Sequence, residues 1–174
     1  MRHLPRTAAA VLATAVLGGI GTRPRSAWYL SLRKPSWQPP SSAFGPVWTA
    51  LYGLVAVASG RALDRMPPER RQGYATALGV NLTLNAAFSW WYFTAERQRA
   101  ALVDEALLVG STIDLLRRTA RVDRPAAAML APYLAWDVFA MALTVAVIRR
   151  NPQPPAGARE SGIGTPTTRG TEGE

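Results

Sequence analysis

Cysteine is absent from this chain of 174 residues, and histidine and lysine occur once each, as His3 and Lys34. The missing thiols exclude a disulfide-stapled scaffold, a cysteine nucleophile and zinc or iron–sulfur sites built on thiolates. A single histidine near the N-terminus argues against a histidine-rich metal site and a Ser-His-Asp triad. Because 20 Lys+Arg oppose 11 Asp+Glu, the formal net charge is +9. Such basicity suggests nucleic acid as a partner. The positions of the charges along the chain decide whether this suggestion holds.

Charged residues are missing from long stretches of the chain. Residues 43–60 and 72–95 carry no charge, and Asp137 is the one charge within residues 125–148. A helix of roughly 20 residues crosses the hydrocarbon core of a bilayer, so each stretch is close to or above the necessary length. A small water-soluble bundle needs a polar side on every surface helix, and such runs do not provide one. We therefore predict three membrane-spanning helices here.

The N-terminal apolar stretch, residues 7–22, permits two interpretations. It follows Arg2 and Arg6 and consists mostly of Ala, Val, Leu and Gly. A positive start, a short apolar run and a small-residue end also describe a secretory signal peptide. We favour a membrane helix, since the run can extend back to Leu4 and no evident mature N-terminus follows it.

Residues 100–116 are predicted as a further helix although they contain the acids Asp104, Glu105 and Asp114. An apolar stripe is expected along one side, at Leu102, Ala106, Val109 and Ile113. Asp114 is expected to pair with Arg117 or Arg118, and the other two acids lie within two turns of Arg97 and Arg99. All three acids are therefore expected near the membrane interfaces, where charge costs less than at the bilayer centre.

These segments predict an all-α integral membrane protein, a five-transmembrane-helix bundle that forms a single domain over residues 1–150. The helices are expected at about residues 5–22, 43–63, 73–95, 100–118 and 125–148, with an ordered loop between the first two and a disordered polar tail at 151–174. The arginines gather in the gaps between apolar runs, so nucleic acid is not expected as a partner. They divide almost evenly between the two sides, which leaves the orientation open.

Aromatic residues and prolines are concentrated between Trp28 and Tyr52, in the sequence WYLSLRKPSWQPPSSAFGPVWTALY. Pro35, Pro39 and Pro40 prevent a long helix in the first half of this segment, because each removes an amide donor and disfavours helical backbone before it. The aromatic side chains suit either an interfacial belt or a preorganised lid over a ligand cavity between helices.

This segment closely resembles the first loop and second helix of the TspO family of tryptophan-rich sensory proteins and translocator proteins. The pattern WYxxLxKPxWxPPxxxFxxVWxxLY is met at Trp28, Tyr29, Leu32, Lys34, Pro35, Trp37, Pro39, Pro40, Phe44, Val47, Trp48, Leu51 and Tyr52. The fifth-helix pattern PYLxWxxFAxxLN is met at Pro132, Tyr133, Leu134, Trp136, Phe139, Ala140 and Leu143, with Thr144 in place of the asparagine. The third-helix pattern is looser, since Asn85 matches, Phe88 stands where tryptophan is usual, and Tyr92-Phe93 replaces a phenylalanine pair.

The resemblance implies a protein that binds a tetrapyrrole such as protoporphyrin IX or haem in a cavity inside the bundle, with sterol-like and isoquinoline-type ligands as further candidates. The implied ligand-binding residues are Trp28, Tyr29, Lys34, Pro39, Pro40, Phe44, Trp48, Tyr52, Asn81, Asn85, Phe88, Trp136, Phe139 and Ala140. Trp48 and Trp136 would stack on a porphyrin, and Lys34 or Arg33 would pair with its propionates. The resemblance implies that the tetrapyrrole is the ligand of a sensory or stress-regulatory protein, and no cofactor or metal is expected to be required. A homodimer is expected, and the arginine-rich, lysine-poor composition points to a bacterial cell envelope.

Other activities are alternatives to binding alone. Some bacterial members of the family promote light-dependent porphyrin breakdown through cavity tryptophans, which makes Trp48 and Trp136 candidate catalytic residues. A transporter of porphyrins or lipids is less well supported, because the chain has no repeated half, no pair of broken helices and no chain of intramembrane acids. A lipid-binding dimeric scaffold is a third candidate. The segment VAVIRRNPQPP has no aromatic residue before Arg149, so the sterol-recognition pattern of animal members is missing.

Several polar or small residues inside the predicted helices need a partner. Asn81 and Asn85 should point inward, either to hydrogen-bond neighbouring helices or to meet a ligand. Ala56 and Gly60 are small residues four apart and indicate a close helix contact or a dimer interface. Asp137 is not part of the family pattern. It is expected to be protonated and packed, paired with an arginine of another helix, or placed in the cavity, and we favour the first two.

Overall fold

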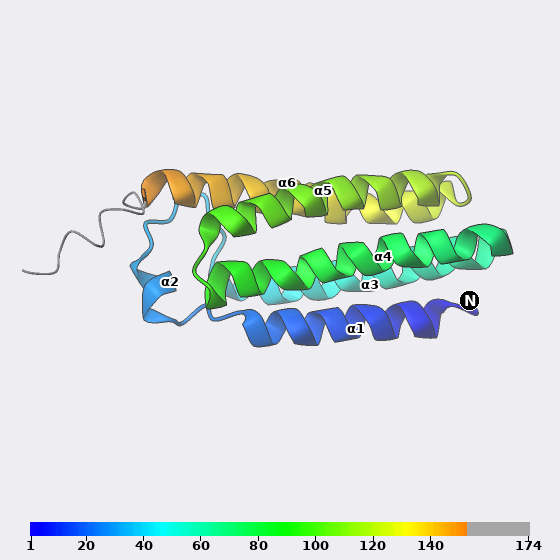
Figure 1. The fold of residues 1–174 in the computed structure, drawn as a ribbon, viewed down its shortest axis with the longest axis horizontal. Helices are drawn as coiled ribbons and strands as arrows, with labels where there is room; N and C mark the ends of the chain where they lie inside the picture. Colours follow the sequence, from blue (N-terminus) through cyan, green and yellow to red (C-terminus); the bar gives the residue numbers. More distant parts are fainter. Residues whose placement is uncertain (153–174) are drawn as a thin grey trace, which may run out of the picture.

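The computed structural model describes residues 1–152, which form α-helices, one π-helical turn and short connections. The helices are α1 (Leu4–Gly21), α2 (Ala27–Ser31), α3 (Ser41–Arg65), α4 (Pro68–Ser89), the π-helix η1 (Trp90–Thr94), α5 (Gln98–Ala120) and α6 (Arg124–Arg150). The expected tail falls mostly on residues 153–174, outside the described residues. Five of these helices are long, and they lie side by side in one bundle (Figure 1).

The long helices follow one another around the bundle in the order α1, α3, α6, α5, α4. This order follows from their packing, since α1 contacts α3 and α4, α6 contacts α3 and α5, and α4 contacts α5. The segment 22–40, with α2, lies at one end of the bundle, which we name the α2 end. The N-terminus and the turns at 66–67 and 121–123 lie at the opposite end (Figure 1).

Prolines and a carboxylate set several helix boundaries. Pro68 occupies the first turn of α4, where its missing amide costs nothing, so this helix begins five residues before the predicted start at 73. Asp123 caps α6 by accepting a hydrogen bond from the amide of Ala126. Arg70 and Arg71, predicted to lie in a gap, are therefore helical.

The connection between α1 and α3 contains a short helix that the sequence did not predict. Ser26 caps α2 by accepting from the amide of Tyr29, and α2 ends before the prolines begin. Asn151 joins this connection to the end of α6, since its side chain accepts from the amide of Arg33 and donates to the Arg33 carbonyl, both at 2.9 Å. The connection is thus held by specific contacts.

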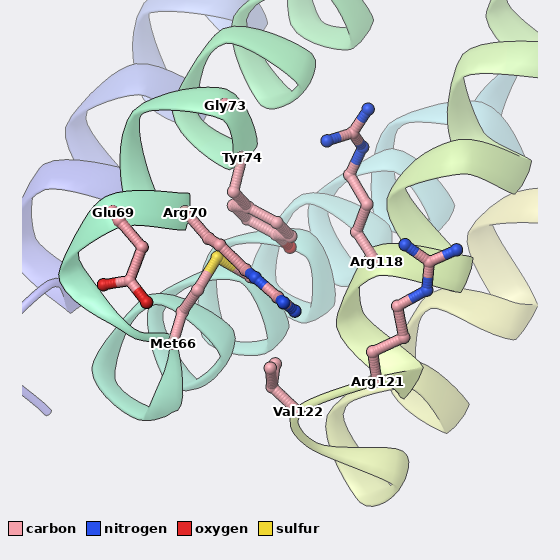
Figure 2. A pocket seen from close by; sticks show the side chains of 8 residues that line it. All are labelled: Met66, Glu69, Arg70, Gly73, Tyr74, Arg118, Arg121 and Val122. Atoms are coloured by element: carbon pink, nitrogen blue, oxygen red, sulfur yellow. The ribbon is translucent and has the colours of Figure 1, made fainter.

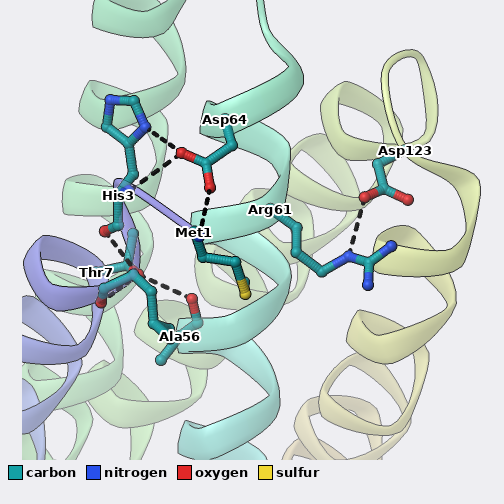
Figure 3. A network of polar contacts seen from close by, with 8 residues as sticks. Met1, His3, Thr7, Ala56, Arg61, Asp64 and Asp123 are labelled. Carbon is teal, nitrogen blue, oxygen red and sulfur yellow. Dashed lines mark hydrogen bonds and ion pairs between the residues drawn. The ribbon is translucent and has the colours of Figure 1, made fainter.

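The contact between α1 and α3 depends on small residues, and Figure 3 shows Thr7 and Ala56 facing each other across it. A Cβ atom at Gly60 would lie 3.1 Å from the Cα of Leu4, so a larger residue would push the two backbones apart. The Thr7 hydroxyl donates to the Ala56 carbonyl at 2.8 Å across the same contact. The prediction of a close helix contact at Ala56 and Gly60 is confirmed, and the dimer alternative stays a prediction.

Ion pairs join the elements at the end opposite α2. The Asp123 carboxylate accepts from Nε of Arg61 at 3.1 Å and also pairs with Arg65, so it links α3 to the turn before α6 (Figure 3). Burial acts to raise the pKa of Asp123, but the hydrogen bonds from Arg61 and the Ala126 amide, together with the two arginine charges, hold that pKa below its ordinary value.

Helix α5 has its polar side inside the bundle. Asp104 and Glu105 are buried, whereas Val103 and Leu107 are 62% and 58% exposed. The prediction that these two acids lie near the interfaces stays a prediction, and their side of the helix packs against neighbouring helices. Asp114 does pair with Arg118 as predicted, at 2.6 Å.

Three of the helices in residues 1–152, namely α1, α3 and α6, are long and apolar enough to cross a membrane by length and composition.

Candidate functional site

A cavity of about 470 Å³ lies between the helices and reaches the α2 end. This volume is in the range of about 300–1,000 Å³ that is usual for small-molecule sites. All five long helices, η1 and the α1–α3 connection contribute to its wall. The sequence-predicted residues that line it are Tyr29, Phe44, Trp48, Tyr52, Asn85, Phe88, Trp136 and Ala140.

The remaining predicted residues lie near the cavity but are not part of its lining. Trp28 packs on Tyr92 with ring centroids 5.8 Å apart, and Phe139 packs on Trp136 at 5.2 Å. Asn81 is fully buried between helices. The other three are Lys34, Pro39 and Pro40, which belong to the α1–α3 connection.

Aromatic rings form one wall of the cavity because α3 and α6 pack together. Trp48 of α3 and Trp136 of α6 stand edge to face, with centroids 6.4 Å apart and planes at 86°. Phe44 packs on Trp136 at 5.7 Å, and Trp48 packs on Tyr52 at 5.3 Å. Side chains of this kind offer flat apolar surfaces to a ligand and hold one another in place.

A chain of buried hydrogen bonds runs behind this wall from α3 to α6. Its successive members are Tyr52, Asn85, Tyr133, Asn81, Thr112 and Asp137, joined at 2.7, 3.1, 3.1, 2.8 and 2.8 Å. Tyr133 is the centre of the chain, since its hydroxyl accepts from Asn85 and donates to Asn81. Asn81 thus serves interhelical packing, whereas Asn85 both packs and lines the cavity.

Two acids line the cavity, and neither was included among the predicted site residues. Asp137 accepts from the Thr112 hydroxyl through Oδ2, and no arginine of residues 1–152 pairs with it. The expected arginine partner for Asp137 is therefore wrong, and packing and cavity lining both apply to this residue. Glu105 lines the same cavity from α5. Its position could not be found from the predicted apolar stripe, because Glu105 is not one of the residues of that stripe.

The first helix supplies small residues that the sequence did not indicate as part of a site. Ala15, Gly18 and Gly19 line the cavity on the α1 side. Nothing lies within 4 Å of a Cβ built at Gly19, whereas one at Gly18 would lie 3.6 Å from the Ser89 hydroxyl. Only the packing of α1 on α4 brings these residues to the cavity.

Lys34 lies at the α2 end, over one residue of the cavity lining. Its Nζ atom is 3.9 Å from the ring centroid of Tyr29, which is the geometry of a cation–π contact. Burial raises the pKa of the Tyr29 phenol, although a hydrogen bond from Gln38 acts in the opposite direction. The phenol therefore stays neutral at pH 7, and the contact is between a cation and a neutral ring.

A second, smaller cleft of about 260 Å³ lies at the end opposite α2 (Figure 2). The side chains of Arg70, Arg118 and Arg121 surround it, together with Glu69 and Tyr74. No predicted site residue belongs to this cleft. Within residues 1–152, no group of three or more histidine, aspartate or glutamate side chains is placed so that it could hold a metal ion.

Comparison with known proteins identifies the family of this chain. The sequence profile of the TspO/MBR family matches residues 7–150. The "Tryptophan-rich protein TspO" of Chlorobaculum tepidum is 34% identical over 131 residues, which cover 75% of this chain and 83% of the relative. The human "Translocator protein" is 35% identical over 127 residues, or 71% of this chain and 75% of the relative. The "Uncharacterized membrane protein YtaB" of Bacillus subtilis is 32% identical over 124 residues, or 71% and 80%. The chain therefore belongs to the TspO/MBR family of membrane proteins.

Proposed function

We propose that this protein binds a tetrapyrrole of the protoporphyrin IX or haem class in the cavity between its helices, as a sensory or stress-regulatory member of its family. The aromatic wall of the cavity carries this proposal, because Trp48 and Trp136 offer flat surfaces to a flat conjugated ligand. The cavity volume of about 470 Å³ suits a small-molecule ligand. The bundle also supplies a natural position for such a site, between helices.

In this proposal all five long helices cross the membrane. Helices α4 and α5 are too polar on average to be identified as spans by composition. Both nevertheless turn apolar residues outward and polar ones inward, with Val80 exposed and Asn81 buried on α4, and Leu107 exposed and Glu105 buried on α5. This arrangement suits a lipid environment, in which polar groups are satisfied inside the bundle.

The ligand has a preferred direction in this cavity. Lys34 lies at the α2 end, next to the lining residue Tyr29. A tetrapyrrole would place its propionates at this end, where the ammonium group favours carboxylates. Its ring system would extend from there toward Trp48 and Trp136.

A fluorescence titration tests the proposal. Protoporphyrin IX at micromolar concentration should quench the tryptophan emission of the purified protein in detergent, because the ligand would lie against two indole rings. A variant that combines Trp48→Phe and Trp136→Phe should bind more weakly, whereas Trp90→Phe should bind as the parent does, since Trp90 is not part of the cavity lining. Emission that protoporphyrin IX leaves unchanged would contradict the proposal.

Light-dependent porphyrin breakdown is a second candidate activity, favoured by the position of both indole rings on the cavity wall. Illuminated protein should then consume bound porphyrin faster than free porphyrin is bleached, as followed by loss of its absorbance. The double variant of Trp48 and Trp136 should lose most of this excess rate when compared at equal occupancy. An unchanged rate in the double variant would remove the tryptophans from the reaction.

A further inference from the structure

The lining of the large cavity contains acidic side chains without basic ones. Glu105 and Asp137 belong to it, and no lysine or arginine of residues 1–152 does. Both acids are removed from solvent, with 3% and 2% of their surface exposed. Acidic side chains this deeply buried normally have a cation or several hydrogen-bond donors beside them.

The hydrogen bonds of these two acids are incomplete. Asp137 accepts from Thr112 through Oδ2, but Oδ1 has no partner among the described residues. Glu105 has no partner for either carboxyl oxygen within the same part of the chain. A buried acceptor without a donor is costly. The cavity wall therefore presents three acceptor atoms that a ligand could satisfy.

The positions of the two acids follow from how α5 and α6 pack. Thr112 of α5 touches Asp137 of α6, and Glu105 lies seven residues before Thr112 on α5. Seven residues of helix extend about 10 Å, so the acids mark two levels of one wall. Trp48 and Trp136 complete the cavity with aromatic faces, which also attract cations.

We propose that this cavity selects flat apolar ligands that carry a protonated amine, which pairs with Glu105 or with Asp137 at one of these two levels. The inference rests on the proposed function only in using the same cavity as a ligand site. The apolar body of the ligand packs on the indole rings, and its ammonium group donates to the carboxyl group beside it. A carboxylate on the ligand is accepted at the α2 end beside Lys34 and excluded from the wall of α5 and α6.

Three pyrene compounds of nearly equal shape test this selectivity: 1-pyrenemethylamine, 1-pyrenemethanol and 1-pyrenecarboxylate. Binding to the full chain in an uncharged detergent is followed by energy transfer from tryptophan to pyrene. The amine should bind at least about tenfold more tightly than the alcohol, as expected for a hydrogen bond to a buried charge. The carboxylate should bind more weakly than the amine.

Isosteric variants identify the groups responsible. Glu105→Gln and Asp137→Asn should each reduce the ratio of amine to alcohol affinity, and the double variant should bring that ratio close to one. Asparagine at position 137 keeps an oxygen that can accept from Thr112, so the polar chain is preserved. Glu69→Gln is the matched control, because it removes a carboxyl group from the cleft at the opposite end (Figure 2) and should leave the ratio unchanged.

The outcomes separate this inference from the proposed function. Equal affinities for all three compounds would overturn the cation preference while leaving the cavity as a ligand site. A preference that persists in the double variant would also overturn it, since the two acids would not be its cause. If the pyrene compounds and protoporphyrin IX all fail to bind, both proposals fail. If the pyrene amine binds with the expected preference and protoporphyrin IX does not bind, only the tetrapyrrole proposal fails.

Discussion

Tyr133 connects the helices of this bundle through a single hydroxyl group. It accepts from Asn85 and donates to Asn81, both at 3.1 Å, and it is fully buried. Tyr133→Phe keeps the ring but leaves one donor and one acceptor of the two asparagines without this partner. We expect a loss of about 1–3 kcal/mol in the free energy of unfolding. Thermal unfolding in detergent, followed by circular dichroism, measures the change.

The control for this variant is Thr83→Val on the same helix as the asparagines. The Thr83 hydroxyl is exposed and donates only to the carbonyl of Gly79, one turn earlier. Its removal should leave the unfolding temperature almost unchanged. Equal effects of the two variants would show that the Tyr133 hydroxyl has no special part in stability.

For single residues, the residue type was enough to predict the position of some side chains but not of others. Asn81 and Asn85 could be placed inside the bundle because an amide facing lipid leaves its polar atoms unpaired. The cavity-lining position of Glu105 was not predicted, since an acid near arginines in sequence suggests only a place near a charged interface. Its actual position depends on the rotation of α5 about its own axis, and the neighbouring helices fix that rotation.

Among the elements, the contact between α1 and α3 depends on residue size. Gly60→Val should separate the two helices, because the space for a Cβ is already limited by Leu4 and Thr7. Gly53 also lies on α3, and nothing lies within 4 Å of a Cβ built there. The Gly60 variant should therefore be less stable than Gly53→Val by about 1–3 kcal/mol, the usual cost of overpacking. Denaturation of both variants in detergent measures this difference, and equal stability would contradict the close contact.

The link between α3 and the start of α6 should depend on pH. The folded protein holds the pKa of Asp123 below its ordinary value. The pKa of an aspartate in the unfolded chain is about 3.9. The contribution of Asp123 is therefore present above this pH and is lost as the pH falls through the folded pKa. Unfolding temperatures measured from pH 7 down to pH 3 should fall more steeply for the parent than for Asp123→Asn. Asparagine still caps α6 but carries no charge, so parallel curves would show that the ion pairs do not contribute.

The helices expected at 43–63, 100–118 and 125–148 end within two residues of the observed α3 (Ser41–Arg65), α5 (Gln98–Ala120) and α6 (Arg124–Arg150). The short helix α2 was missed because five residues give too little periodicity to detect. The start of α4 was placed too late because the charges of Arg70 and Arg71 suggested a loop. Charged residues at a membrane interface can be helical, and here α4 continues through them.

For the whole molecule, the number of membrane crossings can be found from the side of the membrane on which each end of a helix lies. The proposal that all five long helices cross places Arg97 and Arg121 on opposite sides, because they flank α5. The chain has no native cysteine, so Arg97→Cys and Arg121→Cys each introduce a single thiol. A membrane-impermeant maleimide added outside intact cells should label one of these variants and not the other. Labelling of both from the same side would mean that α5 does not cross.

The sequence by itself determined that this protein is helical, belongs in a membrane and carries the aromatic and proline motif of its family. These properties are readable because long apolar runs, helix-breaking residues and short motifs are local along the chain. The tertiary structure decided which sides of the helices face one another, and with them the cavity, the polar chain through Tyr133 and the two acids in the cavity wall. Those features require groups from several helices, and their positions depend on helix rotation and packing, which a local pattern does not specify.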